Sequence, residues 1–254
     1  MSSAAQDPGP QAERSYGLRD SLILFAKSPV AGEVKTRMCP PFSREEAAAF
    51  YAEMLDDALV ETARIARQLE LTAVLSVHPA GACAEFADRI GGLGESVSTL
   101  FRVVPQRGRD LAERMEWAVA EGASGGARKL LLRGSDCPIL DDKAVSDALA
   151  ALDECDVVLL PDLGGGYGMI GLREPVPELF RQEMSTPEVA DETVARARAL
   201  GLRARLLESS FDINKVVDLL RLAEARERGL ARACPKTLAF LDSRKLWPTP
   251  SGAS

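Results

Sequence analysis

A loop with three cations follows the first apolar run of the chain. The segment Lys27–Arg37 carries Lys27, Lys35 and Arg37, although the formal net charge of the chain is −7. Gly32 in the same loop would let the backbone approach a ligand closely. Cations and free backbone N–H groups together suit a di- or triphosphate, and the alternative is a solvated surface loop. The loop is not a Walker motif, because its glycine lies three residues before the Lys-Thr pair.

A carboxylate follows another apolar run. The segment Gly134-Ser-Asp-Cys-Pro138 comes directly after Lys129–Leu132. Asp136 is therefore placed to hold a hard cation such as Mg²⁺ or Mn²⁺, which would bridge phosphate oxygens. An equally weighted alternative is that Asp136 caps the next helix or stabilises the turn before Pro138.

Two later loops add polar groups. Gly164-Gly-Gly-Tyr-Gly168 precedes an apolar run rather than a helix, so it is not a dinucleotide-binding signature. Its glycines indicate either close backbone contact with an acceptor or a structural turn. Asp212 and Asn214 lie two residues apart and could face one site in an extended segment. Asn214 could also cap a helix that begins at Lys215.

The elements that must position these loops alternate along the chain. Short continuous apolar runs are typical of strands buried on both faces, and longer amphipathic stretches between them are typical of helices. We therefore predict an α/β fold with one domain, a mostly parallel sheet and helices on both faces, whose ligands bind at the carboxyl ends of the strands. The predicted strands are 21–25, 71–77, 100–104, 129–132, 156–160, 168–172 and 203–207. The predicted helices are 43–58 behind a Ser43–Glu46 capping box, 83–90, 110–121, 142–152, 187–200 behind a Thr186 cap, and 215–228.

Composition narrows the classes of function. Apolar residues make up 46% of the chain, charged residues 27%, and the acidic balance argues against nucleic acid or anionic lipid as a partner. Five cysteines without a Cys-x-x-Cys pair make a zinc site or disulfide framework unexpected. The only histidine, His78, is expected at a strand end or in a loop. No run reaches the length of a membrane span, so we expect a cytoplasmic protein with a disordered leader (1–17), a domain (18–246) and a loose tail (247–254).

The loops together resemble a known family. The segment Phe25-Ala-Lys-Ser-Pro-Val-Ala-Gly-Glu-Val-Lys-Thr-Arg37 is the most specific part, followed by Gly134–Pro138 and Gly165-Gly-Tyr167. Weaker blocks include Ser185-Thr186 and Asp212-Ile213. The chain is similar, over about residues 21–220, to small bacterial transferases with the GT-A fold, the selenodomain-associated or arsenosugar-biosynthesis glycosyltransferases. More distantly it resembles the guanylyltransferases of molybdenum cofactor and of phospholactate.

The resemblance implies a transferase with a nucleotide-activated donor, a small-molecule acceptor and a Mg²⁺ or Mn²⁺ cofactor. It implies a nucleotide or phosphate site, a metal site, an acceptor loop and a catalytic role for Asp136. The phosphate site would comprise Phe25, Ala26, Lys27, Gly32, Lys35, Arg37 and Ser135. The metal would be held by Asp136, Asp212 and Asn214, and the acceptor loop would be Gly165, Gly166 and Tyr167. Asp162, the acid nearest to the glycine loop, is the candidate for a catalytic general base by its location only.

Three positions depart from the family pattern. Gly164 stands where an aspartate is usual, Gly168 where an aromatic residue is common, and Asn214 replaces the second acid of an Asp-x-Asp pair. Glycosyl transfer from a sugar nucleotide is the leading hypothesis, and nucleotidyl transfer to a phosphorylated small molecule is the second. The third hypothesis is a nucleotide-binding protein that has lost turnover. The sequence leaves the nucleobase, the sugar, the acceptor and the oligomeric state open.

Overall fold

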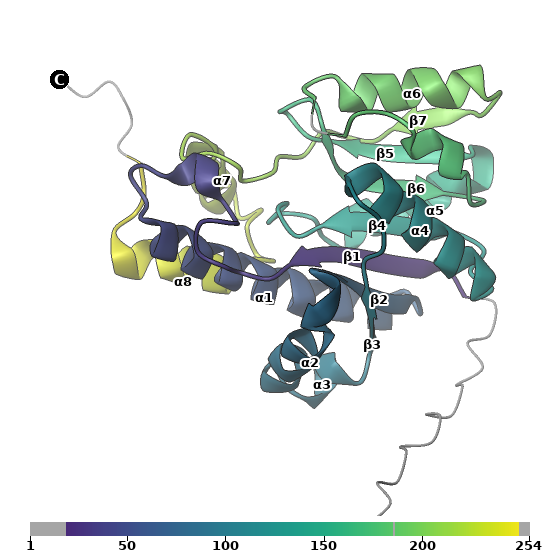
Figure 1. The fold of residues 1–254 in the computed structure, drawn as a ribbon. Helices are drawn as coiled ribbons and strands as arrows, with labels where there is room; N and C mark the ends of the chain where they lie inside the picture. Colours follow the sequence, from purple (N-terminus) through teal and green to yellow (C-terminus); the bar gives the residue numbers. More distant parts are fainter. Residues whose placement is uncertain (1–18, 185, 249–254) are drawn as a thin grey trace, which may run out of the picture.

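The strands of the protein form where the sequence has its short apolar runs. A computed structural model describes residues 19–184 and 186–248, and its sheet has seven strands in the order β3-β2-β1-β4-β6-β5-β7 (Figure 1). Continuous apolar strands are buried on both faces, as expected for a sheet covered by helices on each side. The strands are β1 (Ser21–Lys27), β2 (Thr72–His78), β3 (Phe101–Pro105), β4 (Leu130–Gly134), β5 (Val157–Pro161), β6 (Tyr167–Leu172) and β7 (Ala204–Leu206).

The strand directions bring the candidate loops to one edge. β1 pairs in parallel with β2 and β4, β2 with β3, and β5 with β7. β6 is antiparallel to both β4 and β5, so its first residue, Tyr167, lies at the edge where the parallel strands end. The predicted α/β fold with a mostly parallel sheet is confirmed, with β6 as the reversed strand.

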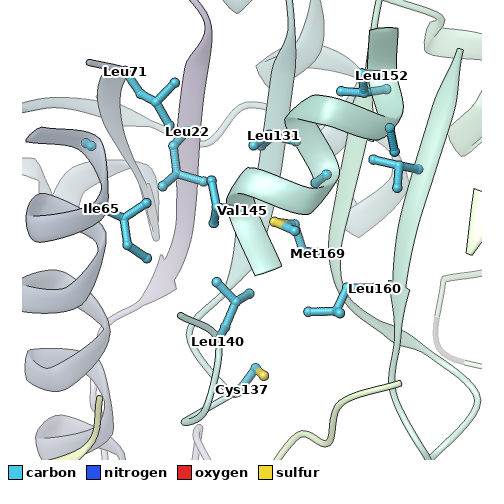
Figure 2. Close-up of a cluster of buried hydrophobic side chains, with 14 of the residues drawn as sticks. Leu22, Ile65, Leu71, Leu131, Cys137, Leu140, Val145, Leu152, Leu160 and Met169 are labelled. Carbon is cyan, nitrogen blue, oxygen red and sulfur yellow. The ribbon is translucent and has the colours of Figure 1, made fainter. Parts of the chain in front are cut away.

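Helices cover both faces of the sheet. The helices are α1 (Arg44–Gln68), α2 (Cys83–Gly92), α3 (Glu95–Ser98), α4 (Leu111–Ser124), α5 (Asp142–Glu154), α6 (Val189–Ala199), α7 (Asp218–Glu227) and α8 (Pro235–Arg244). On one face, α1, α2 and α5 pack on alternate strand residues such as Leu22, Leu24 and Leu131. On the other face, α4, the 3₁₀ helix η3 (Pro177–Phe180) and α6 pack on the residues between them, such as Ile23 and Leu132. Figure 2 shows part of the first face, where Leu22 and Leu131 meet Val145 and Leu152 of α5.

A smaller layer lies at the end of the sheet where β1 finishes. The start of α1 packs there with α7, α8 and the 3₁₀ helix η1 (Thr36–Met38) around Phe50 and Leu222 (Figure 1). α1 is 25 residues long and begins with the predicted capping box, in which Ser43 Oγ accepts from Glu46 N and Ser43 N donates to Glu46. This layer holds the basic loop against the strand ends.

Three predicted capping roles are wrong. α6 begins at Val189 after Glu188, so Thr186 does not cap it and Pro187 is not its first residue. α7 begins at Asp218 rather than Lys215, and Asn214 is not its cap. Instead, the Asp218 carboxylate accepts hydrogen bonds from the backbone N–H groups of Asn214 and Lys215, at 2.9 and 2.7 Å.

The third wrong assignment concerns Asp136. α5 is capped by Asp141, whose side chain accepts from Ala144 N at 3.0 Å, so Asp136 is not needed as a helix cap. Two helices, α3 and α8, were not predicted from the sequence.

The ends of the chain lie largely outside this description. The predicted leader, residues 1–17, Ser185 of the family block, and residues 249–254 of the predicted tail all fall outside the described residues. Trp247, the first tail residue, donates a hydrogen bond from Nε1 to Asp242 at 2.8 Å. In the described residues, every helix is too short or too polar to cross a bilayer.

Candidate functional site

Two pockets adjoin each other where the strands end. The first, of about 410 Å³, extends from the basic loop to His78 and the residues that follow β3. The second, of about 770 Å³, extends from the same edge towards β6 and the start of α6. Because the pockets share a wall, a ligand could reach from one into the other. The shared lining residues are Phe25, Arg37, Leu111, Gly134, Asp136 and Asn214.

The cations of the basic loop differ in how far they are already paired within the protein. Lys27 Nζ donates to the Glu33 carbonyl at 2.9 Å and lies 3.7 Å from the Glu33 carboxylate. Arg37 is exposed, lines both pockets, and has no carboxylate within 4.0 Å among the described residues. Gly32 has φ 81°, so it supplies the left-handed turn of the loop, outside the lining of either pocket. Arg37 is therefore the cation most available to a phosphate.

Lys35 is turned inward. Its backbone is left-handed, with φ 48° and ψ 31°, which is uncommon for a residue with a side chain. Its Nζ lies 2.8 Å from Asp136 Oδ1 and 2.5 Å from the Ile213 carbonyl oxygen, and only 4% of its side chain is exposed. The first loop and the two acidic loops thus meet at a buried ion pair.

Tyr51 of α1 contacts residues on both sides of this ion pair. Its hydroxyl lies 2.9 Å from Ser135 Oγ, accepts from Lys27 N at 3.1 Å, and its ring faces Lys35 Nζ at 5.7 Å. Burial, and then the negative charge of Asp136, raises the pKa of Tyr51 to about 12. The phenol therefore stays protonated, and it ties together the loops after β1 and β4.

Three carboxylates converge on the other side of the junction. Asp212 Oδ1 is buried without a hydrogen-bond partner among the described residues. Burial, followed by the charges of Asp136 and Asp162, raises the pKa of Asp212 to about 7. Asp162 Oδ1 accepts from Gly164 N at 2.8 Å and lies 3.5 Å from Asp212 N. The charges of Lys35 and Arg133 lower the pKa of Asp212 but do not offset the burial and the two neighbouring carboxylates.

This cluster of acidic groups fits a divalent ion in part. Asp136, Asp212 and Asn214 line the second pocket together, and they offer two carboxylates and an amide oxygen. In residues 19–184 and 186–248, no three Asp, Glu, His or Cys side chains are grouped closely enough to hold a metal by themselves. Mg²⁺ commonly combines one or two carboxylates with substrate phosphates, so an ion here would need a bound nucleotide to complete its ligands.

A known protein family matches part of this chain. The family model described as an uncharacterized protein conserved in bacteria (DUF2064) matches residues 60–186, which is half of the chain. The chain belongs to the DUF2064 family. The match includes the Asp136 and Gly165–Tyr167 loops of this DUF2064 protein, and it begins after the basic loop.

Solved structures agree with the fold. A protein from Desulfovibrio desulfuricans G20, described as a nucleotide-diphospho-sugar transferase, superposes with a TM-score of 0.78 at 26% identity. The match covers 89% of this chain and 96% of that one. A cytidylyltransferase from Leptospira borgpetersenii superposes with a TM-score of 0.53 at 9% identity over 93% of this chain and 100% of that one, which shows the shared fold alone.

One relative with a known reaction is a guanylyltransferase. Phosphoenolpyruvate guanylyltransferase from Chloroflexus aggregans is 32% identical to this DUF2064 protein over 115 residues. The match covers 44% of this chain and 55% of that relative, so the chain spans about half of the relative's length. This match confirms a distant similarity to a guanylyltransferase, while the resemblance to those of molybdenum cofactor and of phospholactate stays a prediction.

The glycine loop of the DUF2064 protein is a turn that also lines a pocket. Gly165 has φ 90°, and a Cβ there would lie 1.6 Å from the Pro187 carbonyl oxygen. Gly165 O accepts from Ala190 N at 3.0 Å, which holds the loop against the start of α6. Gly166 and Tyr167 line the second pocket, whereas Gly165 serves the turn.

Several pocket residues were not predicted. Arg133, in an otherwise apolar strand, is 2% exposed and has a buried Nη1 without a partner among the described residues. Burial lowers the pKa of Arg133. A lone cation within an apolar run was a usable signal for this residue. Tyr51 and Thr186 gave no such signal, because only tertiary packing brings them to the strand ends.

Proposed function

We propose that this protein is a transferase that binds a nucleotide-activated donor across the shared wall of the two pockets. The observation that supports this most is that Arg37 and Asp136 line that wall and Lys35 Nζ lies 2.8 Å from Asp136, so that a diphosphate would lie among the three. Cations placed around a leaving diphosphate stabilise the charge that develops on it. The nucleoside would occupy the first pocket, and the transferred group and its acceptor would occupy the second.

The second pocket has the groups that a polar acceptor requires. Thr186 Oγ1 and Asp212 Oδ1 line it, and both are buried without hydrogen-bond partners among the described residues. Buried polar atoms are normally paired, so two unpaired atoms around one pocket indicate that a ligand supplies the partners. Tyr167 also lines the pocket, and burial raises the pKa of its hydroxyl, which therefore stays protonated.

The positions of the residues that line the two pockets indicate a role for each of them. Arg37 would bind the phosphates directly, and Lys35 would reach them by leaving Asp136. Asp136, Asp212 and Asn214 would hold Mg²⁺ or Mn²⁺, which supplies charge stabilisation to the diphosphate when it is bound. Asp162 is the proposed general base if one is needed, because its carboxylate lines the acceptor pocket.

Glycosyl transfer from a sugar nucleotide is the leading reaction, supported by the similarity to the Desulfovibrio protein. Nucleotidyl transfer is the second candidate, and the similarity to a guanylyltransferase favours it. The released products distinguish the two reactions. Glycosyl transfer releases a nucleoside diphosphate from a sugar nucleotide, whereas nucleotidyl transfer releases pyrophosphate from a nucleoside triphosphate.

A calorimetric titration of nucleoside triphosphates and sugar nucleotides, with and without Mn²⁺, tests the proposal. We expect binding that is tightened by the metal and weakened by Arg37→Met, with Arg109→Met as a control at an exposed cation that pairs with Glu113. Failure of every nucleotide to bind would overturn the proposal. Binding without turnover for any donor and acceptor would favour the binding-protein hypothesis.

A further inference from the structure

Gln106 presents a fixed hydrogen-bond acceptor to the first pocket. It follows β3 directly and is 8% exposed. Its Nε2 donates to the carbonyl oxygen of Ser76 at 2.8 Å and to that of Ala26 at 3.4 Å. Because both partners can only accept, the amide nitrogen must face them. Oε1 is then the atom left for a ligand in the pocket that Gln106 lines.

Arg114 of α4 presents donors to the same pocket. Its Nη1 lies 3.3 Å from His78 Nδ1, and its Nε is buried without a partner among the described residues. Burial and the charges of Arg114 and Lys27 lower the pKa of His78, so the neutral ring can accept the hydrogen bond. No carboxylate lies within 4.0 Å of Arg114 in the part of the chain that the structure describes. The guanidinium is therefore held in place but keeps free donors.

The strand order indicates over which strands the base and the phosphates of a bound nucleotide would lie. Val77 pairs with Pro105, Lys27 with His78, and Phe25 with Gly134 in the order β3-β2-β1-β4. The ends of β3 and β1 are two strand spacings of about 4.8 Å apart, and the Gln106 amide reaches across β2 to the Ala26 carbonyl oxygen of β1. The phosphates would lie over β1 and β4, and the base would lie over β2 and β3.

On the basis of the proposed nucleotide site, we infer that Gln106 and Arg114 determine base specificity and select guanine. Guanine places two adjacent acceptors, O6 and N7, beside the donors N1–H and N2–H₂. Arg114 matches the acceptors and Gln106 Oε1 matches the donors. Adenine would place an amino group against the guanidinium, and pyrimidines lack the second acceptor of that edge.

The test compares GTP with ITP, which lacks only the N2 amino group, by calorimetry on the full chain with Mn²⁺. We expect GTP to bind about 3–10-fold more tightly than ITP, the effect of one hydrogen bond. Gln106→Met should reduce that ratio to near one, and Gln106→Asn, which withdraws the amide, should do the same. Because each ratio is taken within one variant, a loss of folded protein affects both nucleotides alike. Gln68→Met, at an exposed site on α1, is the matched control and should keep the wild-type ratio.

Arg114→Met completes the test. It should weaken GTP binding at least tenfold while changing ATP binding little. An unchanged GTP-to-ITP ratio in both Gln106 variants would overturn the assignment of Gln106, and tighter binding of ATP or CTP than of GTP by the wild type would overturn the choice of guanine. In either case the proposed function would stand, because a nucleotide would still bind. Absence of binding by every nucleotide would overturn both proposals.

Discussion

Lys35 Nζ lies 2.8 Å from Asp136 Oδ1, which joins a predicted phosphate ligand to a predicted metal ligand. The ammonium therefore takes the position of a cation beside the acidic cluster. Burial and the charges of Asp136 and Asp162 raise the pKa of Asp212, and this lysine, together with Arg133, opposes them before any nucleotide binds. Nucleotide binding would draw Lys35 towards the phosphates and leave Asp136 for a metal ion.

Replacing Lys35 should therefore change metal and nucleotide affinity in opposite directions. We expect Lys35→Met to bind Mn²⁺ more tightly than the wild type in the absence of nucleotide, because Asp136 is released. The same variant should bind nucleotide at least tenfold more weakly, as a charged hydrogen bond contributes about 1.5–3 kcal/mol. Titration of Mn²⁺ followed by electron paramagnetic resonance measures the first effect. Lys143→Met, at an exposed ion pair with Asp147, is the control, and equal Mn²⁺ affinities of Lys35→Met and the wild type would contradict the exchange.

Asp212 should make the metal-free protein less stable as the pH rises. Its pKa is raised from 3.8 to about 7 in the folded state, so the folded protein binds more protons than the unfolded chain between these values. The free energy of unfolding should then fall from about pH 4 to about pH 7 and level off above it. Asp212→Asn should remove much of this slope and stabilise the protein by about 2–4 kcal/mol at pH 8. Urea denaturation across this pH range provides the measurement, and identical slopes for variant and wild type would exclude this role.

Gly165→Ala should destabilise the wall of the second pocket. A Cβ would lie 1.6 Å from the Pro187 carbonyl oxygen, and φ is 90°. Gly201 has a similar φ of 75° with nothing within 4 Å of a Cβ, so Gly201→Ala isolates the backbone effect, about 1 kcal/mol. We expect Gly165→Ala to cost at least twice as much in thermal unfolding. Equal losses would show that the loop moves away from Pro187 without resistance.

Asp57 of α1 should stabilise α8. Its carboxylate accepts from Lys236 N, Thr237 N and Thr237 Oγ1 at 3.1, 2.8 and 2.7 Å, so it caps α8 from another helix. Asp57→Ala leaves these donors unpaired, and we expect a loss of about 2–3 kcal/mol in the free energy of unfolding. Asp153→Ala, at an exposed carboxylate paired with Lys129, is the control and should cost less than about 1 kcal/mol. Similar losses for the two variants would contradict the capping role.

The sequence by itself determined the elements and the edge at which the site lies. Continuous apolar runs predicted the inner strands β1, β2, β4, β5 and β6, because a strand buried on both faces needs apolar residues at successive positions. The edge strands β3 and β7 were also predicted, although each contains an exposed arginine. The Ser43–Glu46 capping box fixed the start of α1, since both of its hydrogen bonds are local. The loops after these strands had to share an edge once the sheet was parallel.

Only the tertiary structure decided how the side chains at that edge pair. Lys35 meets Asp136 across about 100 residues of chain, and Asp57 caps α8 from a distant helix. Asn214 is not a cap because α7 begins only at Asp218, whose carboxylate binds the Asn214 N–H. Thr186 is not a cap because the Gly165 carbonyl accepts from Ala190 N at the start of α6. Ion pairs and hydrogen bonds depend on atoms that approach to about 3 Å, and sequence spacing specifies such distances only within one helix, strand or turn.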